Sequence, residues 1–317
     1  MRIVSIEEIR RVVGPREAFR SAEIAFRAMA EGRVCLPLPM ALAMPERRGE
    51  VHIKAAHLAG SPVFTVKIVS GFGANATEGT PVNSGYVGVF DSATGHPLGI
   101  LLDGGYLTDL RTAAAGALAA TLLAPRDLSK IAVFGTGVQA RYQLRALTHA
   151  GRKADRTVAW GRNPEALDAY CREMRLDPGV AVVAAATPED AVRDADLVVT
   201  ATAAREPIIE ARWLAPSATV IAVGADMPEK RELGRGVLRR DGKIVVDSLA
   251  QCAAFGELHH AVADGDLSAG DVYAELGEIA SRRKAGREGS EMIVCDLTGL
   301  GVQDAAIGEV AWSQIAR

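Results

Sequence analysis

One stretch of the chain, Lys130-Ile-Ala-Val-Phe-Gly-Thr-Gly-Val-Gln-Ala-Arg141, constrains the fold more than any other. The apolar run at 131–134 predicts a strand that stops at Gly135, after which a helical pattern begins. Gly135 permits a tight turn, Gly137 lets the backbone approach phosphates, and Ala140 lets the helix pack close to the strand. The helix N-terminus adds N–H groups and a positive dipole end. We therefore predict a dinucleotide-binding turn whose contacts to the cofactor come from Gly135, Thr136, Gly137, Val138 and Gln139.

After this turn, strand and helix patterns alternate. Buried strands are predicted at residues 131–134, 157–160, 180–184, 197–200, 219–223 and 243–246, with helical segments between most of them. Such alternation is typical of a parallel sheet covered by helices. We therefore expect an α/β, Rossmann-type doubly wound domain over residues 111–291.

The two ends of the chain have a different pattern. Residues 6–31 have helical spacing, residues 51–54, 65–69 and 86–91 are predicted strands, and residues 71–85 form a long, glycine-rich loop. An alanine-rich helix at 107–123 leads into the glycine turn, and the tail contains an apolar strand at 292–295 before a final helix. We expect residues 1–110 and 292–317 to form one α+β domain, into which the dinucleotide domain is inserted.

The composition excludes several classes of protein. A net charge of −3 and a hydrophobic content of 49% argue against nucleic-acid binding, which requires a basic face. Charges near the N-terminus argue against a signal peptide, and no apolar run approaches the roughly 20 residues of a membrane span. The four cysteines form no CxxC pair, so we expect a reduced, cytoplasmic protein without a metal site. The cluster Glu257-Leu-His-His260 is a polar helix face or, alternatively, a metal ligand set.

The second strand of the dinucleotide domain ends in Ala159-Trp-Gly-Arg-Asn163, without the acid that usually binds the adenosine ribose. Arg162 is suited to stack on adenine or to pair with a 2′-phosphate, and we assign Asn163 to the same site. NAD(H) and NADP(H) both remain open, with a lean to NADP. In the alternative, Arg162 is only solvated and NAD binds through backbone contacts.

Other candidates follow the later strands at their carboxyl ends, where open α/β sheets bind ligands. Asp226, in Val223-Gly-Ala-Asp-Met-Pro-Glu-Lys230, is a candidate proton-transfer group. Because Asp before Met-Pro-Glu is also a natural helix N-cap, that alternative stays open. We further assign to the cofactor site Thr200, Ala201, Thr202, Val223 and Gly224.

Two cations lie within otherwise apolar or small-residue segments. Lys67 ends the run Phe64-Thr-Val-Lys67, where burial without a partner would be costly. It either binds a substrate carboxylate or polarises a C=N bond, or it faces water on an edge strand. Arg111 has a guanidinium suited to bidentate carboxylate binding. The alternative for Arg111 is a salt bridge to Asp109 or Asp103.

Taken together, several segments resemble the ornithine cyclodeaminase/μ-crystallin family, in order along nearly the whole chain. They are Val66-Lys67, Ser92-Ala-Thr-Gly95, Leu107-Thr-Asp-Leu-Arg-Thr-Ala-Ala114, Gly135-Thr-Gly-Val-Gln-Ala140, Val223-Gly-Ala-Asp226 and Asp296-Leu-Thr-Gly-Leu-Gly-Val-Gln-Asp304. The resemblance implies a homodimer joined through its substrate domains. It also implies hydride transfer at an amino or imino carbon, as in ornithine cyclodeamination, alanine dehydrogenation, and reduction of cyclic ketimines or iminosuccinate. Some members instead carry out side-chain elimination.

The resemblance also implies roles for single residues. Lys67 and Arg111 would bind the substrate carboxylate, Thr112 would approach the cofactor phosphate, and Asp226 would be the general acid/base beside the nicotinamide. Hydride delivery to C=N requires such a set, namely a cation for the carboxylate and a proton donor for the nitrogen.

The chain also departs from the family. Many members have Pro-x-Arg where this chain has Leu36-Pro-Leu-Pro-Met40, and ornithine cyclodeaminases have a glutamate where it has Val51-His-Ile-Lys-Ala-Ala-His57. His52 and Lys54, with Arg47 and Arg48 nearby, would suit an anionic side chain. Alternatively, Lys54 replaces the missing arginine at the α-carboxylate.

We therefore expect an NAD(P)H-dependent reductase of a small α-imino acid, such as iminosuccinate, or the reverse dehydrogenase. The alternatives are a cyclodeaminase with bound NAD and a non-enzymatic, crystallin-like protein.

Overall fold

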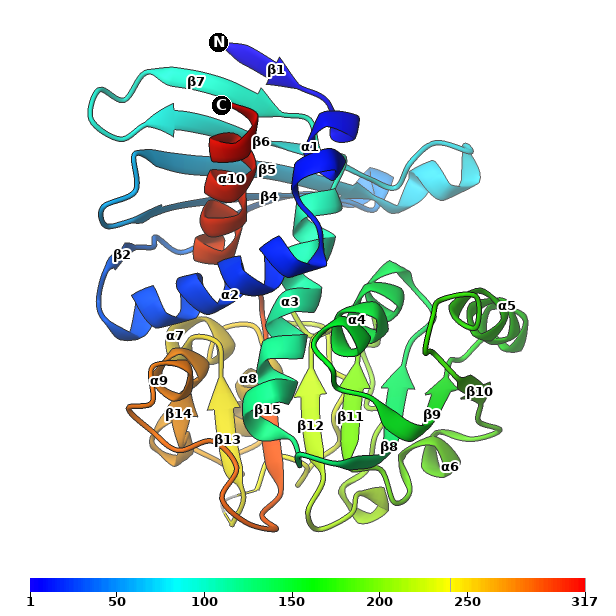
Figure 1. The fold of residues 1–317 in the computed structure, drawn as a ribbon. Coiled ribbons are helices and arrows are strands. Elements are labelled where there is room, and N and C mark those ends of the chain that lie inside the picture. The colour runs from blue at the N-terminus through cyan, green and yellow to red at the C-terminus, as the bar shows by residue number, and fades with distance from the viewer. Residues whose placement is uncertain (240, 317) are drawn as a thin grey trace. The chain divides into compact units, whose positions relative to one another are not determined.

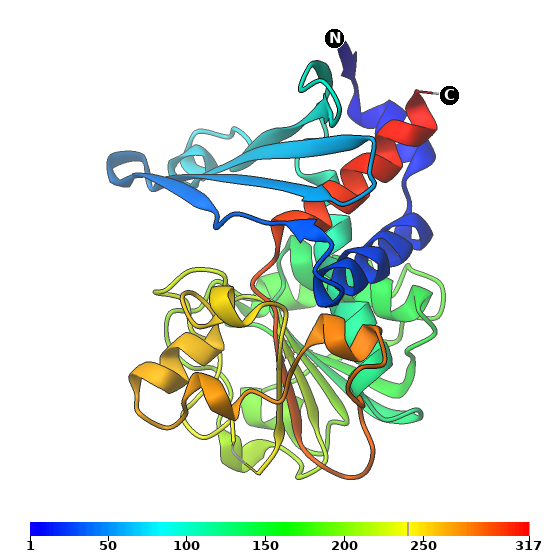
Figure 2. The ribbon, with the colours of Figure 1, turned by 90° about the vertical axis from the view of Figure 1, so that its left-hand side faces the viewer.

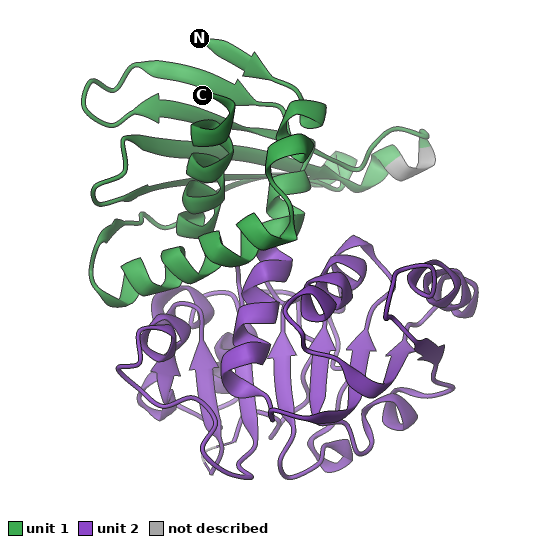
Figure 3. Cartoon of the chain, viewed as in Figure 1, with its two compact units in different colours: residues 1–111, 300–317 green, residues 112–299 purple. Residues whose placement is uncertain are grey.

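The computed structural model describes residues 1–239 and 241–316, apart from the side chains of Ala76 and Thr77. The chain divides into two compact units (Figure 3). Unit 1 comprises residues 1–111 and 300–317, and unit 2 comprises residues 112–299. In sequence, unit 2 is therefore an insertion within unit 1.

Unit 1 is built on a seven-stranded sheet in the order β1-β7-β6-β5-β4-β2, with β3 also paired to β4. Neighbouring strands are antiparallel except for β1 and β7. Lys67 lies on β5, in the middle of this sheet, so the edge-strand alternative for Lys67 is wrong. The strands are β1 (Arg2–Val4), β2 (Val34–Cys35), β3 (Met40–Met44), β4 (Gly49–Leu58), β5 (Val63–Phe72), β6 (Asn83–Asp91) and β7 (Pro97–Leu101).

Helices α1 (Ile6–Val12), α2 (Pro15–Ala30) and α10 (Gly301–Ile315) belong to unit 1 (Figures 1 and 2). Helix α10 packs so closely on the sheet that a Cβ at Gly308 would lie 3.1 Å from Thr65. The helical spacing at 6–31 is confirmed as two helices, because the chain is extended at Val13 and Gly14 and a second helix starts at Pro15. Proline lacks an N–H and fits the first position of a helix, so it favours a new start there.

Unit 2 contains an eight-stranded sheet, and every strand pair in it is parallel. The order β10-β9-β8-β11-β12-β15-β13-β14 confirms the doubly wound α/β fold. The strands are β8 (Leu128–Phe134), β9 (Ala154–Trp160), β10 (Val182–Ala184), β11 (Leu197–Thr200), β12 (Thr219–Ala222), β13 (Lys243–Val246), β14 (Ala274–Glu275) and β15 (Ile293–Asp296).

Helices flank this sheet (Figure 1). They are α3 (Tyr106–Leu123), which starts in unit 1, α4 (Val138–His149), α5 (Pro164–Met174), α6 (Pro188–Val192), α7 (Leu249–Cys252), α8 (Glu257–Ala263) and α9 (Leu276–Ala280). The core beneath them consists mainly of buried aliphatic side chains from the strands, helices and loops of this unit, together with Phe134. None of the described helices is both long and apolar enough to cross a membrane.

The tail strand corrects the predicted domain boundary at residue 292. Strand β15 pairs with β12 and β13, so residues 292–299 belong to unit 2 and not to the domain of the chain ends. All four residues of β15 are buried. A strand that is covered on both faces in this way is typical of the interior of a parallel sheet.

The loop predicted at 71–85 is shorter than expected. Strand β5 extends to Phe72 and strand β6 begins at Asn83, with their ends paired through Gly71 and Asn83. The remaining predicted strands each coincide with a strand of the structure, within a few residues at their ends.

Candidate functional site

The glycine turn follows β8 and is shaped by its neighbours in the sheet. Gly135 has φ +115°, and a Cβ there would lie 2.6 Å from the carbonyl oxygen of Ala201. The Gly135 N–H donates to the Trp160 carbonyl at 2.9 Å. Glycine is therefore required at position 135 by both the backbone and the packing of β8 against β11.

Gly137 has no such requirement within the protein. It is the N-cap of α4 with φ −83°, a conformation open to any residue. A Cβ at Gly137 would meet no described atom within 4 Å. The bare backbone therefore faces open space at a helix N-terminus, which is the surface that a pyrophosphate needs. The residues present thus fit a dinucleotide, and Val138 and Gln139 form the first turn of α4 beside it.

Arg141 braces the turn from behind, and sequence reasoning missed this residue. Its Nη1 donates to the carbonyls of Thr136 and Gly137, the latter at 3.1 Å. Its Nε donates to Glu173 at 2.7 Å, and its guanidinium lies 5.3 Å from the centre of the Tyr170 ring. Because Arg141 binds two carbonyl groups of the turn, it restricts the conformation of the turn. The sequence signal that could have identified Arg141 is its position, one helical turn after Gly137.

Thr112 lies on α3, next to α4. Its carbonyl accepts a hydrogen bond from Nε2 of Gln143 at 3.1 Å. A Cβ at Gly116 would collide with the Gln143 side chain, so α3 and α4 approach closely here. The Thr112 assignment to the cofactor phosphate stays a prediction.

At the end of β9, Arg162 is exposed, and no hydrogen bond or ion pair joins its guanidinium to any residue that the structure describes. Asn163 is the N-cap of α5, where its Oδ1 accepts the Ala166 N–H at 2.9 Å. The Asn163 side chain is thus engaged by the helix, whereas the Arg162 charge remains available to a ligand.

The segments that follow β11 and β12 lie side by side, because Thr200 and Ala222 are paired across the two strands. This places Thr200, Ala201 and Thr202 next to Val223 and Gly224. A fully buried carboxylate, Glu232, accepts hydrogen bonds from Thr200, Thr202 and Gly224. Sequence reasoning also missed Glu232, because an isolated glutamate in a polar stretch gives no sign of burial.

Asp226 lies in the turn after β12, and its side chain is 49% exposed. The chain after Asp226 forms a turn and no helix, so the N-cap alternative is wrong. Asp226 instead forms an ion pair of 2.6 Å with Lys230. The carboxylate is thus half-exposed and paired with Lys230, and its proton-transfer role stays a prediction.

The two predicted carboxylate-binding cations of unit 1 meet at one acidic residue, Asp304 of α10. Lys67 Nζ lies 2.9 Å from Asp304 and 3.3 Å from Thr108 Oγ1. Arg111 Nε donates to Asp304 at 2.9 Å, and its Nη1 lies 3.4 Å from Gln303 Oε1. The ion-pair partner of Arg111 is therefore Asp304, and not Asp109 or Asp103 as the alternative had it.

Lys54 adds a third cation to this cluster. It is the direct cross-strand partner of Lys67 in the β4–β5 ladder, so both side chains leave the same face of the sheet. The pKa of Lys67 is lowered to about 7, mainly by burial and also by Arg111 and Lys54, while Asp304 acts in the opposite direction. Burial also acts to raise the pKa of Asp304, but the same three cations outweigh it and lower that pKa.

A second carboxylate, Asp103, interacts with Lys67 and accepts the Leu107 N–H at 2.9 Å. Asp103 and Asp304 are thus two carboxylates that interact electrostatically with Lys67. His52 lies on the same face as Lys54, and its Nε2 is 3.5 Å from Glu50. The structure thus brings Lys54, Lys67 and Arg111 together and places His52 two residues along the same strand.

The chain is similar to known proteins over nearly its whole length. The family model for the ornithine cyclodeaminase/mu-crystallin family matches residues 2–316. A relative from Sinorhizobium fredii, described as an uncharacterized cyclodeaminase, is 40% identical over 99% of this chain and 96% of its own.

Two solved structures share the fold over nearly their whole length. The first is a Thermococcus litoralis Δ1-pyrroline-2-carboxylate reductase in complex with NADH and L-proline. It has a TM-score of 0.92 and 27% identity, over 99% of this chain and 97% of its own. The second is the Paracoccus denitrificans iminosuccinate reductase in complex with NAD⁺. It has a TM-score of 0.90 and 27% identity, over 99% of this chain and 95% of its own.

Proposed function

The chain belongs to the ornithine cyclodeaminase/mu-crystallin family, and we propose that it reduces a small α-imino acid to the α-amino acid with NAD(P)H, or catalyses the reverse dehydrogenation. It is an NAD(P)-dependent oxidoreductase acting on C=N or CH–NH₂ groups.

The observation that carries the proposal is a pair of buried cations on one carboxylate. Lys67 and Arg111 are both buried and share Asp304, and Lys54 lies beside Lys67 in the β4–β5 ladder. Two cations that share a single carboxylate favour a further anionic ligand. The α-carboxylate of an amino or imino acid carries one negative charge and accepts hydrogen bonds from both a lysine and a guanidinium.

The proposed chemistry divides the roles among three side chains. When bound, the nicotinamide supplies the hydride to the imine carbon or accepts it in the reverse direction. Lys67 and Arg111 hold the carboxylate, and Lys67 also polarises the C=N bond. Asp226 would give a proton to the substrate nitrogen in the reduction, and it would take that proton back in the reverse reaction.

Among imino acids, we propose an anionic one such as iminosuccinate. His52 and Lys54 stand where ornithine cyclodeaminases carry a glutamate, which favours a second carboxylate over an amine. Arg47 and Arg48 add little to this case, since Arg47 pairs with Glu78 at 2.6 Å and Arg48 donates to the Gly73 carbonyl at 2.9 Å.

For the cofactor, we propose NADP(H) over NAD(H), because the Arg162 guanidinium is exposed at the end of β9 and no acid follows that strand. A 2′-phosphate would pair with this arginine. If NADH and NADPH were instead used equally well, Arg162 would be only a solvated surface residue.

A panel of imines formed from keto acids and ammonia or methylamine tests the function. Each imine, including iminosuccinate from oxaloacetate and ammonia, would be assayed with NADH and with NADPH in parallel. Oxidation of the cofactor on an imino acid supports the proposal. Ammonia release from ornithine without net cofactor change would instead indicate a cyclodeaminase, as the name of the 40% identical relative suggests. Tight cofactor binding with no turnover would indicate a crystallin-like protein.

Lys67 predicts the pH dependence of substrate use. Because its pKa is lowered to about 7, Lys67 loses its charge as the pH rises above that value. We therefore expect kcat/KM for a carboxylate substrate to fall by about tenfold per pH unit above 7 where this charge is required. In Lys67→Arg, the guanidinium stays charged, so the same fall should be absent although the rate is lower. An identical pH profile in both enzymes would exclude Lys67 as the carboxylate-binding group.

The outer face of the unit 1 sheet supports a homodimer. The strand registers place a set of apolar residues on the face opposite Thr65 and α10, and several of them are exposed, including Ile3, Met40, Leu42 and Tyr86. Large exposed apolar surfaces usually mark an interface. We propose that a second copy of the chain covers this face through its own copy of the sheet.

We expect the double variant Met40→Asp, Leu42→Asp to be monomeric in size-exclusion chromatography with light scattering, because two buried charges would oppose the contact. The control is Ile24→Asp on α2, where the side chain is 52% exposed and lies on an element outside the proposed contact. A wild-type monomer, or a dimer that survives the double variant, would contradict the interface.

A further inference from the structure

The turn that carries Asp226 is closed into a ring by Glu232. The Gly224 N–H, at the start of this turn, donates to Glu232 Oε2 at 2.8 Å, eight residues further along the chain. A Cβ at Gly224 would collide with the Thr202 carbonyl and would lie 2.6 Å from the Glu232 carboxyl. Asp226 therefore lies inside a short loop whose two ends are fastened together by one carboxylate.

The same carboxylate also holds the neighbouring segment after β11. Thr200 Oγ1 donates to Glu232 Oε2 at 2.6 Å. The Thr202 N–H and Thr202 Oγ1 both donate to Oε1, each at 2.7 Å. Glu232 is fully buried, and its two oxygens together accept four hydrogen bonds from the ends of two adjacent strands.

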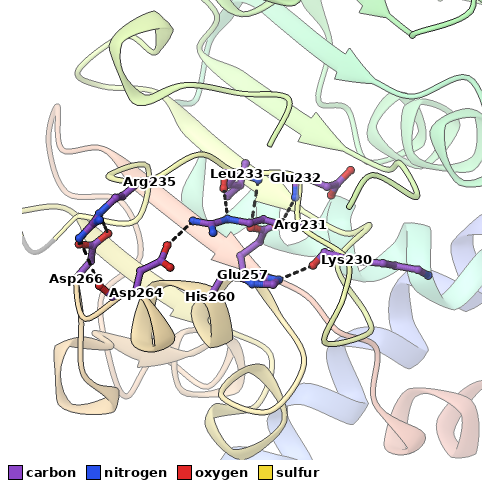
Figure 4. A network of polar contacts seen from close by, with 9 residues as sticks. All are labelled: Lys230, Arg231, Glu232, Leu233, Arg235, Glu257, His260, Asp264 and Asp266. Atoms are coloured by element: carbon purple, nitrogen blue, oxygen red, sulfur yellow. Dashed lines mark hydrogen bonds and ion pairs between the residues drawn. The ribbon is translucent and has the colours of Figure 1, made fainter. Parts of the chain in front are cut away.

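The backbone of Glu232 is fixed from the opposite side by α8 (Figure 4). Glu257 accepts the Glu232 N–H at 2.6 Å and the Leu233 N–H at 3.2 Å. His260 Nε2 donates to the Lys230 carbonyl at 2.8 Å. The face of α8 that contains Glu257 and His260 thus holds this turn in place, because both side chains form hydrogen bonds to the backbone of residues 230–233.

We infer that Glu232 is a positioning residue that keeps Asp226 in register with the Thr200–Thr202 segment. The inference rests on the proposed function, in which Asp226 transfers the proton and the segment after β11 contacts the cofactor. A proton-transfer group on a turn needs its position fixed to within about half an ångström, and a buried carboxylate joined to both segments provides that constraint. Glu232 touches neither substrate nor cofactor and acts through Asp226.

Glu232→Gln tests the inference with little change in shape. An amide has only one acceptor oxygen, so its NH₂ group must face either the Thr202 N–H or the Gly224 N–H, and one backbone hydrogen bond is lost. We expect kcat to fall by about 10- to 100-fold. The cofactor affinity, measured by energy transfer from tryptophan to NADPH or NADH, should fall by a smaller factor than kcat, because the glycine turn is untouched.

A double-mutant cycle with Asp226→Asn separates positioning from general damage. If Glu232 acts through Asp226, Glu232→Gln should lower kcat by less than about threefold in the Asp226→Asn background. Multiplication of the two losses would overturn the inference. A full rate in Asp226→Asn alone would instead show that the proposed role of Asp226 had failed, which is a distinguishable result.

Two further variants keep the test decisive if Glu232→Gln folds poorly. Thr200→Val removes one donor to Glu232 without changing the shape, and it should lower kcat by three- to tenfold in the same non-additive way. Arg235→Gln is the matched control, because Arg235 belongs to the exposed rim of the network in Figure 4, where it pairs with Asp266. An equal loss of kcat in Arg235→Gln would assign the effect to the network as a whole and overturn the specific role of Glu232.

Discussion

Replacing Gly137 with valine should abolish binding of the nicotinamide cofactor while the protein stays folded. The side chain would enter the open space at the N-terminus of α4, where the backbone must approach the pyrophosphate. No described atom lies within 4 Å of the new Cβ, and φ of −83° is acceptable for valine. The stability should therefore fall by only about 1 kcal/mol, the usual effect of a poor N-cap residue.

Titration with NADH and NADPH, followed by energy transfer from tryptophan, measures the loss of binding, and thermal unfolding measures stability. Gly270→Val is the matched control, because Gly270 is exposed in unit 2 and has a negative φ. Gly135→Ala should behave in the opposite way and lose stability, since position 135 has φ +115° and no room for a Cβ. Normal cofactor titration of Gly137→Val would place the dinucleotide elsewhere.

The sequence predicted the dinucleotide unit well because its signals are local. Strands such as β11 and β12 are buried on both faces, so they appear as continuous apolar runs. The turn at Gly135 and Gly137 depends on residues within one short stretch of chain. Neither kind of feature requires knowledge of which distant segments meet.

The features that the sequence did not predict depend on distant contacts. Arg111 and Asp304 are 193 residues apart, and nothing in either local pattern indicates that they pair. Strand β15 joins the middle of the sheet although it comes last in that unit, and its apolar run alone does not specify its neighbours. Glu232 was missed for the same reason, since its four donors lie on segments that only the fold brings together.

Asp226→Asn should lower turnover by about 10²- to 10⁴-fold, the range for loss of a general acid or base. The substitution keeps the size of the side chain and removes its negative charge and its ability to exchange a proton. Stability should hold to within about 1 kcal/mol, because the charge contact that is lost among the described residues is the half-exposed ion pair with Lys230. Steady-state kinetics across pH and thermal unfolding of the same samples measure the two effects.

Lys230→Met distinguishes proton transfer from a structural role for Asp226, since it breaks the same 2.6 Å ion pair and leaves the carboxylate in place. If Asp226 transfers the proton, Asp226→Asn should lose far more turnover than Lys230→Met. Equal losses of turnover in the two variants would show that Asp226 acts only as the ion-pair partner of Lys230. The proton donor would then be His52, Lys54 or a water molecule. The single variants His52→Gln and Lys54→Met, which both change strand β4, would then show which of these two residues is the donor.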